Sequence, residues 1–139
     1  MTQLVLPTFA NNLGNIFGGQ VLSWIDMCAA ISAYRHARSA VVTASIDAVD
    51  FLLPIKVGHI VILKSQINAV FRTSMECGVA IWSEDPNTGE YLKAMKAYTT
   101  YVSLDVAGKP QPVQPLVLMS DEDKRRASDA RARRQKRIG

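Results

Sequence analysis

Long apolar runs and cysteines are both scarce in this chain of 139 residues. No stretch of about 18 apolar residues runs without a charge, which argues against a membrane-spanning helix, and the N-terminus lacks the basic start and apolar core of a secretory signal peptide. The only two cysteines, Cys28 and Cys77, are too few for a disulfide framework. We therefore expect two reduced core thiols and a cytoplasmic protein.

Most of the chain also has no excess of positive or negative charge. The formal net charge is +4, but residues 121–139 hold eight Lys or Arg and four Asp or Glu, so opposite charges cancel over the first 120 residues. Acids interspersed among the basic residues favour a solvated helix there, and we expect no nucleic-acid partner and no membrane surface. The composition indicates one domain at residues 1–119, followed by a basic helical or disordered tail at residues 120–139.

Hydrophobic periodicity predicts one long helix and, after it, an antiparallel meander. The apolar stretch at residues 19–36 is too long for a strand, so we expect a helix there. Asp85-Pro86-Asn87-Thr88-Gly89 predicts a hairpin turn in which glycine supplies the positive φ. Alternating or β-branched patterns predict strands at residues 2–6, 41–51, 59–71, 74–82 and 90–104. The order β-α-β-β-β-β is that of an α+β fold with one helix packed on a curved sheet.

One acid interrupts the predicted apolar helix. Between Gly18 and Tyr34, Asp26 is the only charged residue. A helix that is apolar on all faces belongs in a core, where a carboxylate is costly unless it is paired or hydrogen-bonded. The preceding residues 11–19 are rich in glycine and asparagine and leave backbone N–H groups free at the helix start, where negative charge is favoured. The pattern predicts a hydrolytic site; the alternative is an aspartate satisfied by a backbone partner.

Short motifs are spread in a characteristic order over residues 4–115. They are Leu6-Pro7, Asn12-x-Gly14-Asn15-x-Phe17-Gly18-Gly19, Leu22-x-Trp24-Ile25-Asp26, Val42-Thr43-Ala44-Ser45, Asp50-Phe51, Pro54-Ile55-Lys56-Val57-Gly58, Arg72-Thr73-Ser74-Met75-Glu76 and Tyr101-Val102. In this order they resemble the acyl-CoA thioesterase family of the hot-dog superfamily. The resemblance implies a long helix wrapped by an antiparallel sheet, and homo-oligomers that are at least dimers and often trimers of dimers. It also implies hydrolysis of acyl-CoA to CoA and a fatty acid, with no metal and no other cofactor.

The same resemblance implies roles for individual residues. Asp26 would be the general base or, alternatively, the nucleophile, while Asn15 and Gly19 would position and polarise the thioester. The implied CoA contacts are Ala44, Ser45, Ile46, Thr73, Ser74 and Met75, with Arg72 near the phosphates. From the residues themselves, Gly18 is a further substrate contact, because it lets a carbonyl approach the helix start. Phe51 and Trp24 are candidates for the wall of an acyl tunnel, with a place in the core as the alternative. Because Asp26 lies about 10 Å along the helix from its first turn, we expect one site to be shared by two subunits.

Two rival functions remain open from the sequence. A hot-dog dehydratase or hydratase usually pairs a histidine with an acid, but His36 and His59 both follow the predicted helix core and no histidine precedes it. A non-catalytic module that binds a CoA ligand is the second alternative. The chain also departs from the family in the loop after Pro7, where Phe9 stands in a run that is usually acidic or small and polar.

Overall fold

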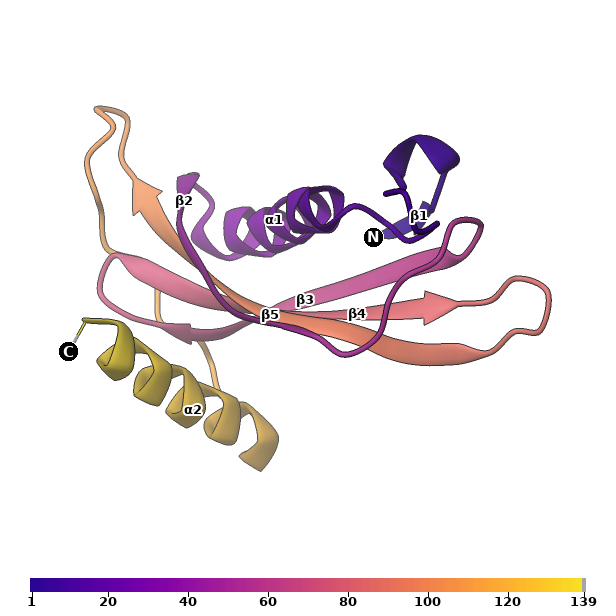
Figure 1. Ribbon diagram of the computed structural model, residues 1–139. Coiled ribbons are helices and arrows are strands. Elements are labelled where there is room, and N and C mark those ends of the chain that lie inside the picture. The colour runs from indigo at the N-terminus through magenta and orange to yellow at the C-terminus, as the bar shows by residue number, and fades with distance from the viewer. Residues whose placement is uncertain (139) are drawn as a thin grey trace.

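A five-stranded antiparallel sheet curls around one long helix, and a second helix lies against its opposite face (Figure 1). The computed structural model describes residues 1–138. The elements are β1 (Thr2–Leu4), a 3-10 turn η1 (Pro7–Phe9), α1 (Gly18–Ala37), β2 (Ala40–Phe51), β3 (Ile60–Val70), β4 (Ser74–Glu84), β5 (Tyr91–Leu104) and α2 (Asp121–Ile138). The strands lie in the order β1-β3-β4-β5-β2, and every neighbouring pair is antiparallel. The predicted α+β architecture is confirmed.

The turn and strand boundaries follow the local chemistry of the chain. Gly89 has a φ of 74°, and the Asp85 carboxylate accepts the backbone N–H of Asn87, as the predicted hairpin requires. The strand β2 lies at an edge of the sheet and departs from regular pairing with β5 between Thr43 and Ser45 and again between Asp47 and Asp50. Such irregularities bend an edge strand and change where its side chains point.

Strict alternation along β4 divides its side chains between the two faces of the sheet. Met75 and Cys77 are fully buried in the core that packs against α1, together with Val79 and Ile81. Cys28 on α1 is also buried, and both cysteines are free thiols, as predicted. Burial raises the pKa of the Cys77 thiol to about 12, so it stays protonated at neutral pH.

The outer face of α1 is exposed, whereas its apolar sequence predicts a helix buried on all faces. The helix is apolar on all sides, yet the structure buries only the face that lies on the sheet; Met27, Ile31 and Tyr34 are each about half exposed, and Asp26 is only partly buried. An all-round apolar helix therefore does not place Asp26 deep inside a single chain. It leaves an apolar helix surface uncovered instead.

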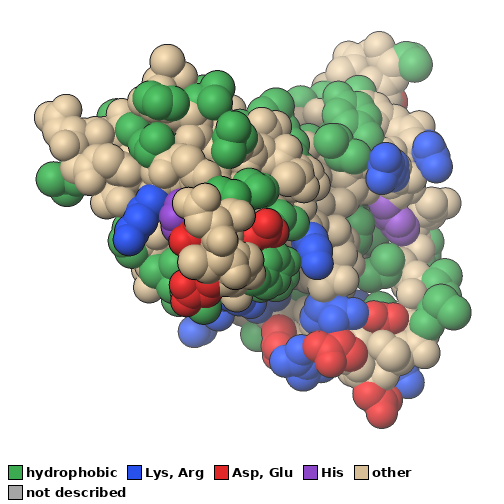
Figure 2. Space-filling model, turned by 90° about the vertical axis from the view of Figure 1, so that its right-hand side faces the viewer, with side chains coloured by type: hydrophobic (Ala, Val, Ile, Leu, Met, Phe, Trp, Pro, Cys, Tyr) green, Lys and Arg blue, Asp and Glu red, His purple; other side chains and the backbone are tan. Residues whose placement is uncertain are grey.

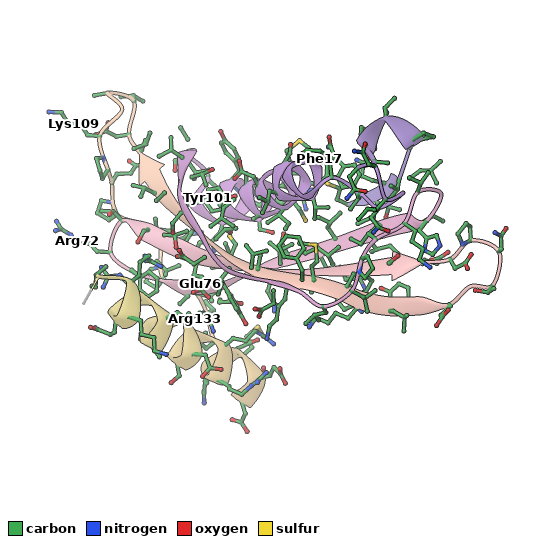
Figure 3. All side chains as sticks on the ribbon, in the orientation of Figure 1. Phe17, Arg72, Glu76, Tyr101, Lys109 and Arg133 are labelled. Carbon is green, nitrogen blue, oxygen red and sulfur yellow. The ribbon has the colours of Figure 1, made fainter. Side chains whose placement is uncertain are left out.

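The helix α2 is docked on the sheet, whereas its sequence predicts a solvated helix. Its charged side chains lie in the lower part of Figure 2, blue and red side by side, as an interspersed pattern predicts. The helix is nevertheless docked: Ala127 and Ala130 are buried against Ala69 of the sheet. Arg133 also forms an ion pair with Glu76, whose side chain is 2% exposed (Figure 3). The interpretation of this segment as a solvated helix is wrong, because small alanines let the helix approach closely enough to pair with a buried acid.

No helix among the described residues 1–138 is long and apolar enough to span a bilayer.

Candidate active site

Two hydroxyl groups converge on one oxygen of the Asp26 carboxylate. Thr43 on β2 donates to Oδ1 at 2.8 Å, and Tyr101 on β5 donates to the same atom at 2.7 Å. The Tyr101 hydroxyl also lies 2.9 Å from the backbone carbonyl of Asp26. The described residues provide no hydrogen bond to Oδ2. The carboxylate is therefore held through one oxygen, while the other remains available to a substrate or a water molecule.

The Tyr101 side chain is well suited to this role as a fixed donor. It is 1% exposed and lies between α1 and the sheet (Figure 3). Burial, and after it the hydrogen bond to Asp26, raises the pKa of the Tyr101 hydroxyl above its ordinary value. The hydroxyl therefore keeps its proton at neutral pH and acts only as a donor toward Asp26.

Free backbone donors lie at the start of α1. No side chain caps this end, and the N–H groups of Gly18 and Gly19 have no acceptor among the described residues. A Cβ atom added at Gly18 would meet nothing within 4 Å, so the backbone there is open to a ligand. Free N–H groups at a helix N-terminus favour a negatively charged or strongly polarised oxygen.

The loop before α1 is organised by Asn11. Its side-chain Oδ1 accepts the backbone N–H groups of Leu13 and Asn15, at 2.9 Å and 3.2 Å. Both bonds use the carbonyl side of the amide, and the described residues provide no acceptor for its NH₂ group. Phe9 packs edge-on against Trp24, with ring centroids 5.4 Å apart, which ties the preceding turn to α1. Trp24 is 3% exposed and belongs to the core.

A cleft of about 390 Å³ joins this loop to the end of β2. Its lining includes Asn11, Asn15 and Gly18 together with Phe51, which is exposed. The remaining lining residues are apolar: Ile16, Leu52, Leu53, Pro54, Ile55 and Met95. The cleft combines amide donors with an apolar wall, which is the surface that an acyl thioester needs.

The structure does not bring Asp26 into this cleft. Asp26 follows Gly18 by eight residues, about 12 Å along the helix axis, and neither Asp26 nor Thr43 nor Tyr101 lines the cleft. A base and an oxyanion donor that act on one thioester must each lie within hydrogen-bonding distance of the reacting atoms. Within one chain the two halves of the predicted site are therefore separate.

The predicted CoA contacts are also spread over several elements. Ala44, Ser45 and Ile46 lie on the edge strand β2, where the Ser45 hydroxyl donates to the Asp47 carboxylate at 3.0 Å. Arg72 is exposed in the turn between β3 and β4, and Thr73 and Ser74 are partly exposed beside it. The Met75 side chain is fully buried in the core, which leaves only its backbone for a ligand.

Thr43, Tyr101 and Asn11 had no role assigned from the sequence, although all three are polar contributors to these surfaces. The residues Thr43 and Tyr101 face each other across β2 and β5, and both fall within motifs that carry the resemblance. Tyr101 is a hydroxyl at a buried strand position, which is a signal for a polar role, whereas Thr43 is exposed on an edge strand and carries no such signal.

A family model for the thioesterase superfamily matches residues 13–90 of this chain. The chain belongs to the thioesterase superfamily. Over 122 residues it is 43% identical to an uncharacterized acyl-CoA thioester hydrolase of Bacillus subtilis, covering 88% of this chain and 71% of that protein. It spans about a quarter of the length of the mouse acyl-CoA and acetyl-CoA thioesterases that it matches.

Solved structures of the family superpose closely on this fold. An apo hexameric acyl-CoA thioesterase has a TM-score of 0.94 and 44% identity, covering 99% of this chain and 88% of that one. An acyl-CoA hydrolase of Staphylococcus aureus, solved with butyryl-CoA, CoA and CoA disulfide, has a TM-score of 0.92 and 36% identity, covering 99% and 84%. The hot-dog fold and the family resemblance are confirmed. The Staphylococcus aureus enzyme has also been solved as alanine variants of an aspartate, a threonine and an asparagine.

Proposed function

We propose that Asp26 of one subunit acts with the α1 start and the Asn11 loop of a partner subunit to hydrolyse acyl-CoA. The chain is an acyl-CoA thioesterase: relatives named for this activity are 36–44% identical over most of its length. The products are free CoA and a carboxylic acid. The observation that carries the catalytic proposal is the Asp26 carboxylate, held through Oδ1 by two hydroxyls with Oδ2 left free.

Residue spacing supports this assignment and amends it at one position. In the Staphylococcus aureus hydrolase, the varied asparagine precedes the varied aspartate by fifteen residues and the varied threonine follows it by seventeen. In this chain Asn11 precedes Asp26 by fifteen residues and Thr43 follows it by seventeen. We therefore assign the catalytic amide to Asn11, whose NH₂ group lacks a described acceptor, and leave Asn15 as part of the cleft wall.

The chemistry follows from these groups. Oδ2 of Asp26 takes a proton from a water molecule, and the water oxygen adds to the thioester carbonyl. The N–H groups of Gly18 and Gly19 stabilise the resulting oxyanion. The tetrahedral intermediate then collapses, the C–S bond breaks, and the CoA thiolate leaves and is protonated. Direct attack by the carboxylate, through a mixed anhydride, is the alternative use of the same oxygen.

A second copy of the chain completes the site in this proposal. The apolar outer face of α1 and the unpaired edge of β2 lie beside Asp26 and Thr43, and both are surfaces that a partner subunit covers. In a two-fold dimer, antiparallel helices bring Asp26 of one subunit toward the α1 start of the other. The hexameric relative supports a trimer of such dimers.

Compartment and cofactor requirements are also part of the proposal. Two free, buried thiols are those of a protein in a reducing compartment, and we infer the cytoplasm. Water and the groups named above supply every atom and proton of the hydrolysis. We therefore expect turnover to persist after dialysis against a metal chelator.

The test is thiol release from acyl-CoAs of increasing chain length by the wild-type chain and by Asp26→Asn. Asparagine keeps the size of the side chain and its acceptor for Thr43 and Tyr101, but it takes no proton. We expect the variant to retain its fold and oligomer and to lose more than about nine-tenths of kcat, at least roughly 1.4 kcal/mol of barrier.

Three other results would contradict this proposal. A variant that keeps most of its kcat excludes Asp26 as base or nucleophile. A wild-type chain that binds CoA and releases no thiol is a binding module. Turnover of an enoyl-CoA or a hydroxyacyl-CoA without thiol release indicates a dehydratase or hydratase.

A further inference from the structure

Three of the residues that line the cleft between the Asn11 loop and β2 are buried, and all three are apolar. Met95 is 1% exposed, Ile55 2% and Ile16 8%, and all belong to the main core. The polar side of the lining, with Asn11 and Gly18, is exposed. The cleft therefore runs from a polar mouth at the start of α1 to an apolar inner end in the core. A partner subunit covers the mouth in the proposed dimer, but a single chain already closes the inner end.

The inner end of the cleft is built on paired strands. Met95 on β5 is the register partner of Phe51 on β2, and partners in an antiparallel pair place their side chains on the same face of the sheet. After Phe51 the chain folds back over β5, where the N–H groups of Leu52 and Leu53 both donate to the carbonyl of Ala94, at 2.8 Å and 3.3 Å. Because β5 is also paired with β4, the backbone at Met95 is fixed and only its side chain can yield to a ligand.

The volume of the cleft limits the length of an alkyl chain within it. A methylene group is similar in size to a water molecule, whose share of liquid volume is roughly 30 Å³, and the cleft has a volume of about 390 Å³. The carbonyl and the sulfur of the thioester occupy the mouth, where the amide donors lie. The remaining space accommodates an acyl chain of roughly eight to ten carbons before the chain reaches Met95.

We propose that Met95 closes the inner end of the cleft and sets the longest acyl chain that the enzyme holds fully buried. This inference rests on the proposed hydrolysis of acyl-CoA, and it names medium-chain acyl-CoAs as the preferred substrates. Each methylene that enters the cleft leaves water and stabilises the bound substrate. A longer chain meets Met95 and keeps its last carbons in water. Methionine suits this place because its unbranched thioether adapts its shape to the end of the chain.

The experiment measures kcat/KM for saturated acyl-CoAs from acetyl to palmitoyl, with wild type and with Met95→Ala. For wild type we expect kcat/KM to rise roughly threefold to fourfold for each added methylene and to reach its maximum at about eight to ten carbons. Alanine lacks Cγ, Sδ and Cε, so the variant has an apolar space at the inner end that an alkyl chain fills. Its maximum should lie at a chain roughly two to four carbons longer, with acetyl-CoA turned over within about twofold of the wild-type rate.

Leu63→Ala is the matched control, because it truncates a buried core side chain that does not line the cleft. Leu63 is 1% exposed and lies on β3, which β4 separates from β5. The change should destabilise the protein to a similar extent and leave the chain-length maximum in place. Met95→Leu keeps the volume of the side chain and should also keep the maximum. If Met95→Ala does not fold, Met95→Val removes less of the side chain and should give a smaller shift in the same direction.

Three outcomes would overturn the proposal. The maximum stays in place in the folded Met95 variants, or it moves equally in Leu63→Ala, or wild-type kcat/KM keeps rising up to palmitoyl-CoA.

Binding of S-alkyl-CoA thioethers separates this inference from the proposed activity, because these compounds carry an alkyl chain and have no thioester to hydrolyse. In calorimetric titrations Kd should fall with chain length and level off at about eight to ten carbons, and at longer chains in Met95→Ala. If the thioethers show this pattern and no acyl-CoA releases thiol, the proposed activity is wrong and the inference about Met95 is confirmed. If thiol is released and the levelling point is the same in both proteins, Met95 does not set the chain length.

Discussion

Asp26 differs from an ordinary half-buried carboxylate in how it is held. Both of its hydrogen bonds reach one oxygen, and they come from two strands that are neighbours in the sheet. Hydroxyl donors on one side leave the other oxygen with a defined direction and a free lone pair. A positioned base of this kind is more effective than a carboxylate that rotates freely.

We expect Tyr101→Phe and Thr43→Val each to lower kcat by about three- to thirtyfold, because each removes a hydrogen bond to a charged group. KM should change little, since neither hydroxyl lies in the cleft that receives the acyl group. The effects of the two changes should not add, because both donors bind the same oxygen. Steady-state kinetics of the single and double variants, with circular dichroism as a fold check, measures this.

Tyr98→Phe is the matched control for Tyr101→Phe. Tyr98 lies three positions earlier on β5 and contacts Arg133, on the side of the sheet that faces α2. Loss of its hydroxyl should leave kcat at the wild-type value. If Tyr98→Phe and Tyr101→Phe lower kcat equally, the tyrosine at Asp26 has no positioning role.

The sequence predicts Asp26 as a candidate, but it does not predict Thr43 and Tyr101, the two residues that hold it. A single charge in an apolar helix marks Asp26 without any knowledge of the fold. The partners depend on the register that places Thr43 opposite Tyr101, two residues nearly sixty positions apart, and that pairing is fixed by the whole sheet. Local pattern alone therefore does not identify them.

For the helix α2, too, local sequence pattern predicts the element but not what it contacts. Its charge and helical pattern predict a helix correctly, and the structure has one at Asp121–Ile138. Whether that helix is solvated depends on its partner surface. Glu76 and Asn68 lie buried on the outer face of the sheet, where the Asn68 side chain donates to the Glu76 carboxylate at 2.9 Å. Once the sheet register shows that Glu76 is buried, a cationic side chain is expected to pair with it. The sequence alone does not show this burial.

We expect Arg133→Met to destabilise the protein by about 3 kcal/mol, because it leaves Glu76 buried without its cation. The value is at the lower end of the range for buried pairs, since the Arg133 side chain is 26% exposed and the Glu76 side chain 2%. Replacing both partners, as in Glu76→Gln/Arg133→Met, should restore part of the loss. Urea unfolding of the two variants and the wild type gives the free energies.

Arg125→Met is the control for the helix. Arg125 pairs with Glu122 on the surface, where both side chains are about 60% exposed, and exposed pairs contribute less than about 1 kcal/mol. If Arg125→Met and Arg133→Met cost the same, α2 is bound to the sheet through its alanines and not through the ion pair.

In the whole molecule, the exposed apolar face of α1 and the unpaired edge of β2 are both surfaces that a single chain leaves uncovered. A single chain leaves Met27, Ile31 and Tyr34 partly in water beside a twelve-residue edge strand. It also leaves the acid and the helix start on separate surfaces. In the proposed dimer, one partner subunit would cover the apolar helix face and bring the second half of the site. The sequence predicts this dimer only through the resemblance and through the length of the helix.

Mixing two inactive variants tests this arrangement. Homo-oligomers of Asp26→Ala lack the base and those of Asn11→Ala lack the amide, so each alone should be nearly inactive. After subunit exchange, a mixed dimer has one site with both groups intact and one with neither, and random pairing should restore about a quarter of wild-type kcat. Thiol release before and after exchange measures the recovery, and native mass spectrometry confirms that mixed oligomers have formed. If mixed oligomers are present and remain as inactive as their parents, Asp26 and Asn11 act within one subunit and the shared site is excluded.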